Sequence, residues 1–306
     1  MLESGERLLK KIEGPRPRRC RDVRYRAEIV RELTNEYALK YLLKASGLSR
    51  STYYYNLRRK PDRYAEERIR IRSVHAANKG RYGYRRIDAQ LRNEGYTINH
   101  KTICRIMREE NLKNIRKRCK YRSYKGEIGK TAPNRLNRNF NPKAPDRKWT
   151  TDVTQINIGV NKCYLSPILD MYNGEIICYT ISNHPDLKMV MNMLDKAYSL
   201  KRKWKGLILH SDQGWHYQHV KYQKSLREHG IIQSMSRKGN CLDNAMMENF
   251  FGIMKTEFLY PNTFRDIGHF KRELKKYIEY YNNDRIKLRL NGMSPVQYRT
   301  HNGVLS

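Results

Sequence analysis

Residues 207–257 read LILHSDQGWHYQHVKYQKSLREHGIIQSMSRKGNCLDNAMMENFFGIMKTE. The three aliphatic residues at the start predict a short buried strand, and Asp212 follows where that strand is expected to end. The segment from Asn244 to Phe258 has apolar residues at helical spacing and carries Glu248, with 35 residues between the two acids. The stretch therefore predicts a strand and a helix that each present one carboxylate.

A third acid lies in a second strand-like segment. Asp152 stands 60 residues before Asp212, in the β-branched run WTTDVTQI of residues 149–156. Taken singly, each acid has an ordinary explanation as a solvent-facing strand residue, a turn cap or a helix-surface glutamate. Together, two aspartates on strands and a glutamate on a helix can converge on one spot. Carboxylate oxygens are the ligands that Mg²⁺ and Mn²⁺ prefer.

Three motifs in this order resemble a known family. They are WTTDVT around Asp152, HSDQGWHY around Asp212, and SRKGNCLDNAMMENFFGIMKTE around Glu248, with Lys255 seven residues beyond Glu248. The chain resembles the catalytic core of insertion-sequence transposases related to retroviral integrases, the D,D-35-E group. It is most similar to the OrfB product of bacterial elements encoded in two overlapping reading frames. The resemblance covers about the whole chain beyond the first sixty residues.

The resemblance implies an α/β fold, a ribonuclease H-like integrase catalytic core preceded by α-helical helix-turn-helix DNA-binding modules. It implies a DNA transposase that cleaves and transfers DNA strands with two Mg²⁺ or Mn²⁺ ions. Asp152 would bridge both ions, while Asp212 and Glu248 would each hold one. Expected partners are double-stranded DNA (the terminal inverted repeats and the target), further copies of the chain, and a possible product of the upstream reading frame.

Two other functions stay open at this point. Another ribonuclease H-like nuclease would use a fourth carboxylate, for which Asp170 is the only candidate. A domesticated, non-enzymatic DNA-binding protein derived from a transposase is the second alternative, and the loss of any of the three acids would favour it. All three acids are present.

The charge is large and unevenly distributed. Lys and Arg number 63 against 30 acids, a net charge of +33. Residues 1–140 hold 38 basic and 15 acidic side chains, and residues 141–306 hold 25 and 15. A basic half ahead of a more balanced half indicates a nucleic-acid-binding arm joined to a catalytic domain. The six cysteines show no zinc-ligand spacing, and no apolar run is long enough for a membrane span. We expect a cytoplasmic, DNA-associated bacterial protein.

The first half of the chain divides into four segments. Residues 1–24 are charged, broken by Gly and Pro, and predicted to be flexible. Residues 25–60 predict a helix-turn-helix, with Arg50, Ser51 and Tyr54 at the start of a DNA-recognition helix. Residues 61–113 predict a second helical DNA-binding module, and residues 114–145 a basic linker. A helical hairpin and a solvated basic face are the alternatives for the two modules.

The second module offers four candidate DNA contacts, which are Arg81, Arg85, Lys101 and Arg105. The catalytic core is expected over residues 146–303, as three antiparallel strands followed by alternating helices and strands and a C-terminal helical extension. On its Glu248 helix, Asn244, Glu248, Gly252 and Lys255 would share roughly one face. Lys255 would then contact a DNA phosphate, unless it pairs with an acid such as Glu248 or Glu257. His210 is expected to be structural, and His216 has no assigned role.

Overall fold

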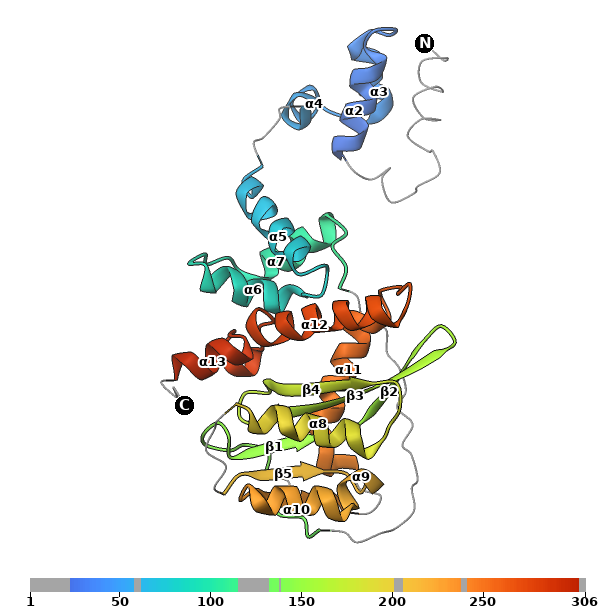
Figure 1. The fold of residues 1–306 in the computed structure, drawn as a ribbon. Helices are drawn as coiled ribbons and strands as arrows, with labels where there is room; N and C mark the ends of the chain where they lie inside the picture. Colours follow the sequence, from blue (N-terminus) through green and yellow to red (C-terminus); the bar gives the residue numbers. More distant parts are fainter. Residues whose placement is uncertain are drawn as a thin grey trace. The chain divides into compact units, whose positions relative to one another are not determined.

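The computed structural model of the 306-residue chain describes residues 23–57, 62–114, 132–137, 139–200, 206–237 and 241–302. The chain forms two compact units, Met1–Glu66 and Glu67–Ser306, and the division falls in the first turn of helix α5 (Figure 1). Residues 1–22 of the predicted flexible segment 1–24 and most of the predicted linker lie outside the described residues, while Val23 and Arg24 begin helix α2. No helix among the described ranges is long and apolar enough to cross a membrane.

The first unit contains three helices, α2 (Val23–Leu33), α3 (Leu39–Ser46) and α4 (Arg50–Leu57). Gly47 ends α3 in the left-handed conformation, with φ of 65°, which glycine adopts without a steric penalty. The Thr52 amide donates to Ser49 Oγ at 3.1 Å at the start of α4. The buried faces of the helices enclose a small apolar core that includes Val30, Leu42 and Tyr53.

A mixed six-stranded sheet forms the centre of the second unit. Its strands are β1 (Lys148–Thr151), β2 (Thr154–Ile158), β3 (Asn161–Asp170), β4 (Ile176–Ser182), β5 (Ile208–Ser211) and β6 (Ile232–Met235). Strands β1 and β2 pair antiparallel with successive stretches of β3, while β5 lies parallel to β1 and β6 parallel to β5. The break between β1 and β2 contains only Asp152 and Val153. The α/β fold predicted from the sequence is confirmed.

Helices cover the sheet with two separate apolar layers. Helices α8 (Leu187–Tyr198), α9 (Trp215–Gln218) and α10 (Val220–Glu228) share one buried cluster with Trp149, Ile168 and Leu209. Helices α11 (Ala245–Met254) and α12 (Ile267–Asn283) share another with Leu165 and Leu169. Ile168 and Leu169 are neighbours on β3, and successive strand residues point to opposite faces. The sheet is therefore buried on both sides (Figure 1).

Three short helical segments extend this core. They are the 3₁₀ turn η1 (Cys241–Asn244) before α11, the π-helical turn η2 (Lys255–Leu259) directly after α11, and the 3₁₀ turn η3 (Leu288–Leu290). The last helix is α13 (Pro295–His301), which Ser294 caps together with Gln297. The sequence periodicity predicts one continuous helix from Asn244 to Phe258. The structure instead changes helical pitch at both ends of α11.

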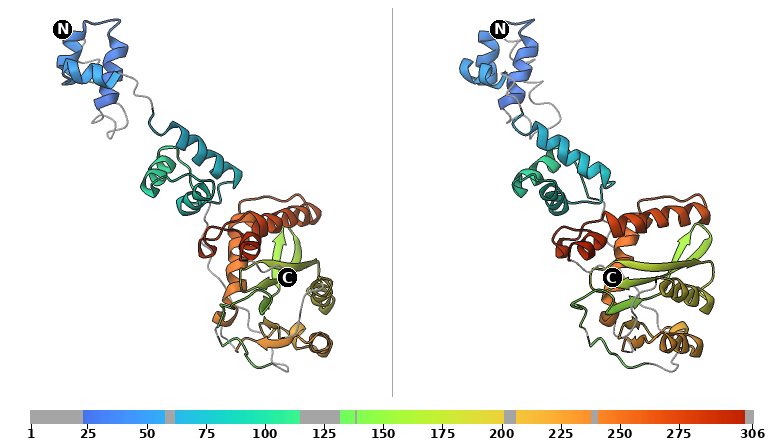
Figure 2. Two further views of the ribbon diagram at one scale, coloured as in Figure 1. Left: turned by 90° about the vertical axis from the view of Figure 1, so that its left-hand side faces the viewer. Right: turned by 60° about the vertical axis from the view of Figure 1, so that its left-hand side comes forward.

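The second helical module belongs to the same compact unit as the sheet. It consists of α5 (Ala65–Ala77), α6 (Tyr84–Asn93) and α7 (His100–Glu109), beside α12 and η3 (Figure 2). The fully buried Tyr82 donates its hydroxyl to the carbonyl of Asp284 at 3.1 Å and accepts from the amide of Ile286 at 2.9 Å. Asn93 Nδ2 donates to the Gly292 carbonyl at 2.8 Å. The module is thus packed on the C-terminal extension.

The end of the predicted linker is also packed on the core. Leu136 is buried, the Arg135 amide donates to Ser234 Oγ at 2.9 Å, and Asn134 Nδ2 donates to Asp243 Oδ2 at 2.9 Å. Residues 132–137 therefore lie along the β6 edge of the sheet. This segment has no apolar period, so its partners could not be read from its own sequence.

Candidate active site

Asp152 and Asp212 lie beyond the same end of two adjacent parallel strands. In the register of β1 with β5, Thr150 lies opposite His210, and each aspartate follows two residues later. Adjacent strands are about 4.8 Å apart, so parallel pairing brings the two side chains to one edge of the sheet. Both aspartates are half-buried.

Asn244 fixes the orientation of Asp152. Its Nδ2 donates to Asp152 Oδ2 at 3.2 Å, and its Oδ1 accepts from Thr150 Oγ1 at 2.7 Å. The Val153 amide donates to the other carboxylate oxygen of Asp152 at 2.7 Å. Asn244 is 5% exposed and ends the 3₁₀ turn η1. The sequence places Asn244 on the face of Glu248 and gives no sign of its contact with Asp152, because that depends on the turn.

Asp212 is held by the loop that follows β5. The Gly214 amide donates to Asp212 Oδ1 at 2.9 Å. A Cβ atom at Gly214 would lie 2.9 Å from that same oxygen, closer than real Cβ contacts. Any larger residue would therefore displace the carboxylate or break this hydrogen bond. This close approach explains why the HSDQGWHY motif has a glycine at position 214.

Glu248 and Lys255 come from the helical run on one side of the two aspartates. Burial raises the pKa of Asp152 well above its usual range, the negative charges of Asp212 and Glu248 raise it further, and Lys255 opposes them. Burial also raises the pKa of Asp212. Asp212, Glu248 and Lys255 are thus each within electrostatic range of Asp152. A cation would relieve the repulsion among the acids.

The donor set fits a hard divalent cation, with one rearrangement. The three candidate ligands supply only carboxylate oxygens, which Mg²⁺ and Mn²⁺ accept. Within the described part of the chain, no group of three His, Cys, Asp or Glu side chains already stands close enough to hold a metal ion. The two aspartates accept hydrogen bonds at strand ends, and the three carboxylates would have to come closer together to hold an ion.

The two histidines near Asp212, His210 and His216, form hydrogen bonds with other groups of the protein. His210 is buried between Ser234 Oγ (2.9 Å from Nδ1) and Ser236 Oγ (3.1 Å from Nε2), and burial lowers its pKa to about 4. It therefore links β5 to the β6 segment as a neutral residue. His216 Nε2 lies 2.7 Å from the Pro185 carbonyl oxygen. The geometry gives both histidines internal partners.

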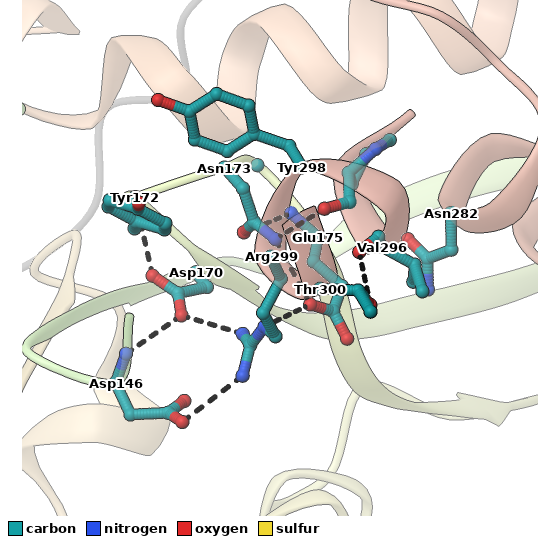
Figure 3. Close-up of polar contacts among 12 residues, drawn as sticks. Asp146, Asp170, Tyr172, Asn173, Glu175, Asn282, Val296, Tyr298, Arg299 and Thr300 are labelled. Carbon is teal, nitrogen blue, oxygen red and sulfur yellow. Dashed lines mark hydrogen bonds and ion pairs between the residues drawn. The ribbon is translucent and has the colours of Figure 1, made fainter. Parts of the chain in front are cut away.

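Asp170, the only candidate for a fourth catalytic carboxylate, belongs to a different cluster (Figure 3). It is fully buried, pairs with Arg299 Nη2 at 2.9 Å, and accepts from the Asp146 and Tyr172 amides. In the antiparallel register Asp170 lies opposite Trp149, three residues before Asp152. At about 3.3 Å per residue, that position is near the other end of the strand. The side chain of Asp170 is directed to Arg299 instead of the Asp152 site.

The predicted DNA contacts in the first unit share one exposed helix. Arg50, Ser51 and Tyr54 are all exposed on α4, and the Arg50 guanidinium lies 6.0 Å from the Tyr54 ring centroid. Ser51 Oγ lies 3.0 Å from Ser49 Oγ. A cation, a hydroxyl and an aromatic ring at the start of one helix are the groups that contact phosphates and bases.

Three of the four predicted contacts in the second module are exposed, which are Arg85, Lys101 and Arg105. Arg85 lines a groove of about 560 Å³ between α6 and η3. Arg81 is different, because it is only 8% exposed and its Nε donates to the Glu257 carbonyl at 3.2 Å. Its guanidinium also lies 4.6 Å from the Tyr280 ring centroid. Arg81 is therefore an internal residue, and its prediction as a DNA contact is corrected.

Comparison with known proteins identifies the family. The sequence matches the Integrase core domain family over residues 142–241, a second Integrase core domain family over 248–302, and the HTH-like domain family over 62–120. It is 48% identical over 274 residues to InsK of Escherichia coli, whose name assigns it as the transposase of insertion sequence element IS150. That match covers 89% of this chain and 97% of InsK.

A second relative agrees with this assignment, and one solved structure can be aligned with the chain. The transposase for insertion sequence element IS904 of Lactococcus lactis is 34% identical, covering 80% of this chain and 100% of that protein. The catalytic core domain of HTLV-2 integrase aligns with a TM-score of 0.41 and 18% identity, over 51% of this chain and 98% of that chain. The sequence relatives and the matched domains carry the assignment. The chain belongs to the family of insertion-sequence transposases with an integrase core domain.

Proposed function

We propose that this transposase cleaves and joins DNA strands at a site where Asp152, Asp212 and Glu248 hold divalent cations. The observation that carries the proposal is the placement of two aspartates at the same end of the adjacent parallel strands β1 and β5. The charge of Asp212 adds to burial in raising the pKa of Asp152, and within the described part of the chain neither aspartate is paired with an arginine or a lysine. A site of this kind is stabilised by Mg²⁺ or Mn²⁺. The resemblance suggests two ions, with Asp152 shared between them.

Cleavage and strand transfer are both displacements at phosphorus. Bound at this site, a pair of divalent ions supplies Lewis acidity to the attacking and the leaving oxygens. The protein's own groups orient the ligands: Asn244 holds Asp152, and the Gly214 amide holds Asp212. Lys255 contributes positive charge beside the acids, where a DNA phosphate would approach.

DNA binding is proposed to rest on both helical modules. Arg50, Ser51 and Tyr54 would contact the DNA from α4, and Arg85, Lys101 and Arg105 from the HTH-like module. The net charge of +33 favours a polyanionic partner held mainly through phosphates. We further infer that copies of the chain assemble on the two ends of the element in the cytoplasm, because each end requires an active site. A product of the upstream reading frame would add contacts to the terminal repeats.

The test is divalent-metal-dependent nicking and joining of a duplex that carries the element's terminal repeat. We expect cleavage with Mg²⁺ or Mn²⁺, none with chelator, and loss of both reactions in Asp152→Asn. Binding without cleavage under all metal conditions would favour the domesticated DNA-binding protein. Cleavage of an RNA–DNA hybrid in preference to the duplex would favour another nuclease, although Asp170 is already engaged by Arg299.

A further inference from the structure

A buried ion cluster lies at the far end of the helical run that carries Glu248. The Glu257 side chain is 10% exposed and accepts from Arg285 through two bonds, Nε–Oε2 at 2.7 Å and Nη2–Oε1 at 2.8 Å. Arg86 Nη1 adds a third bond to Oε1 at 3.1 Å. These three residues, together with Arg81 on the Glu257 carbonyl, form the Glu257 cluster.

The cluster connects two parts of the second unit that are distant in sequence. In the HTH-like module, Arg81 lies just before α6 and Arg86 in its first turn, while Glu257 belongs to η2 and Arg285 follows α12. Arg86 Nη1 also lies 3.5 Å from the Arg81 carbonyl, and the Arg81 guanidinium faces the rings of Tyr277 and Tyr280. The contacts of Arg86 with Glu257, and of Arg81 with the Glu257 carbonyl, Tyr277 and Tyr280, therefore join the module to η2 and α12.

The chemistry of these links favours a fixed orientation. Apolar side chains of similar volume often stabilise a buried contact as well as ions do, since ions lose hydration on burial. A bidentate arginine, in contrast, donates two parallel N–H bonds to the two oxygens of a carboxylate, and this requires one relative geometry. Glu257 is bound by one such fork and by a second guanidinium from α6. The arrangement restricts rotation and sliding of the module relative to η2.

The helical run transmits this orientation to the active site. Helix α11 passes into η2 without a break, and Glu257 lies nine residues after Glu248. At about 1.5 Å per residue the two carboxylates are separated by about 13 Å along the helix axis. A displacement of the module that moves Glu257 would therefore also move Glu248, because α11 and η2 form one continuous helical run.

We propose that Arg86 and Glu257 are positioning residues that hold the HTH-like module in register with the helix carrying Glu248, and so determine which phosphodiester is cut. This inference rests on the proposed function, since it requires the module to bind DNA and Glu248 to act in cleavage. The module contacts DNA through its exposed side chains, and the cluster fixes its distance from the reacting phosphate. Arg86 and Glu257 act through the protein and touch neither DNA nor metal.

The experiment maps cut positions at single-nucleotide resolution on an end-labelled duplex carrying the terminal repeat. Arg86→Met removes the link from α6 and leaves the Glu257–Arg285 pair intact. We expect cutting at the wild-type position to fall by about 10²-fold, the cost of a misplacement of about 1 Å, and cuts to appear at neighbouring phosphodiesters. Arg86→Lys should restore part of the original position. Arg92→Met is the matched control, because Arg92 lies on the same helix and its ion-pair partner among the described residues is Asp88, also in α6.

The outcomes separate positioning from folding. If Arg86→Met lowers thermal stability and total activity while all cuts stay at the wild-type position, the inference is wrong. If Arg86→Met fails to fold, Tyr82→Phe takes its place, since it removes one hydroxyl between the module and residues 284–286, and it should spread the cuts in the same way. A wild-type protein that makes no metal-dependent cut would overturn the proposed function, and the positioning role with it.

Discussion

The two ends of the helical run from Ala245 to Leu259 present carboxylates in opposite surroundings. Near its start, Glu248 lies within electrostatic range of Asp152, where burial and the negative charges of Asp212 and Glu248 raise the pKa of Asp152. Near its end, burial alone would raise the pKa of Glu257, but the hydrogen bonds from Arg285 outweigh it and hold that pKa below its ordinary value. The end with Glu248 has more negative than positive side chains nearby, whereas the negative charge of Glu257 is balanced by arginines.

The difference distinguishes a site whose negative charge favours binding of a ligand from a site whose negative charge is balanced by protein groups. Acids that repel one another cost folding free energy, and such strain is common where a cation or substrate is to be bound. Glu257 has two guanidinium partners and needs no ligand. The Arg299 cluster is intermediate, because one guanidinium serves Asp146, Asp170 and Glu175. Burial raises the pKa of Asp170 to about 6, and the negative charge of Asp146 adds to this rise while Arg299 opposes it.

The largest expected effect is on catalysis at the acid-rich end. Asp152→Asn, Asp212→Asn and Glu248→Gln should each reduce strand cleavage and joining below detection, because each removes a proposed metal ligand. DNA affinity should change little, since it comes mainly from phosphate contacts elsewhere. Gel-based strand-transfer and filter-binding assays measure the two quantities. Asp195→Asn, at an exposed position on α8, is the control. Near-normal strand transfer in any of the three variants would remove that residue from the site.

The largest effect on folding is expected at the arginine-rich end. Glu257→Ala leaves Arg285, which is 1% exposed, without its carboxylate. Breaking a buried pair in this way typically lowers the free energy of unfolding by about 3–5 kcal/mol. Denaturant unfolding measures it. Glu273→Ala removes a partly exposed acid that pairs with the exposed Lys276 on α12, and should change stability little. Equal losses in the two variants would contradict the comparison.

The pH dependence of stability should differ in sign between Asp170 and Glu257. The folded pKa of Asp170, about 6, is above its unfolded value. Its contribution to stability is therefore full below about pH 4 and is lost as the pH rises through 6, a change of about 3 kcal/mol. The lowered pKa of Glu257 acts oppositely, with stability present above its unfolded pKa and lost as the pH falls.

Unfolding of wild type, Asp170→Asn and Glu257→Gln between pH 4 and 7 tests this contrast. The stability of wild type relative to Asp170→Asn should decrease as the pH rises, and relative to Glu257→Gln it should increase. Differences that run in the same direction for the two variants would show that the Arg299 and Glu257 clusters are not distinguished by their ratio of acids to arginines.

The sequence predicted the α/β fold and the elements that carry the three acids, because strand and helix patterns and motif spacing are local signals. It could not predict what depends on distant partners or on irregular turns. Arg81 looks like a surface cation in a basic segment, and its neighbour Tyr82 bonds to a residue 202 positions away. The roles of Asn244 and Arg299 were missed for the same reason. The helix periodicity also hid the turns η1 and η2, which alter the directions of Asn244 and Lys255.

The smallest effect on folding, together with a clear effect on activity, is expected for substitutions of Lys255. This residue lies between Glu248 and Glu257 on the helical run. It begins η2, is half-buried, and opposes the raised pKa of Asp152. Its proposed task is to attract a phosphate, so Lys255→Ala should weaken productive binding of the DNA end and strand transfer. Lys255→Arg should retain part of both, because the charge remains although the fork approaches less closely. Were Lys255 only a partner for a nearby acid, its loss would cost about 0–1 kcal/mol and no activity. Thermal unfolding measured beside strand transfer decides between the two, and full activity of Lys255→Ala would rule out the phosphate contact.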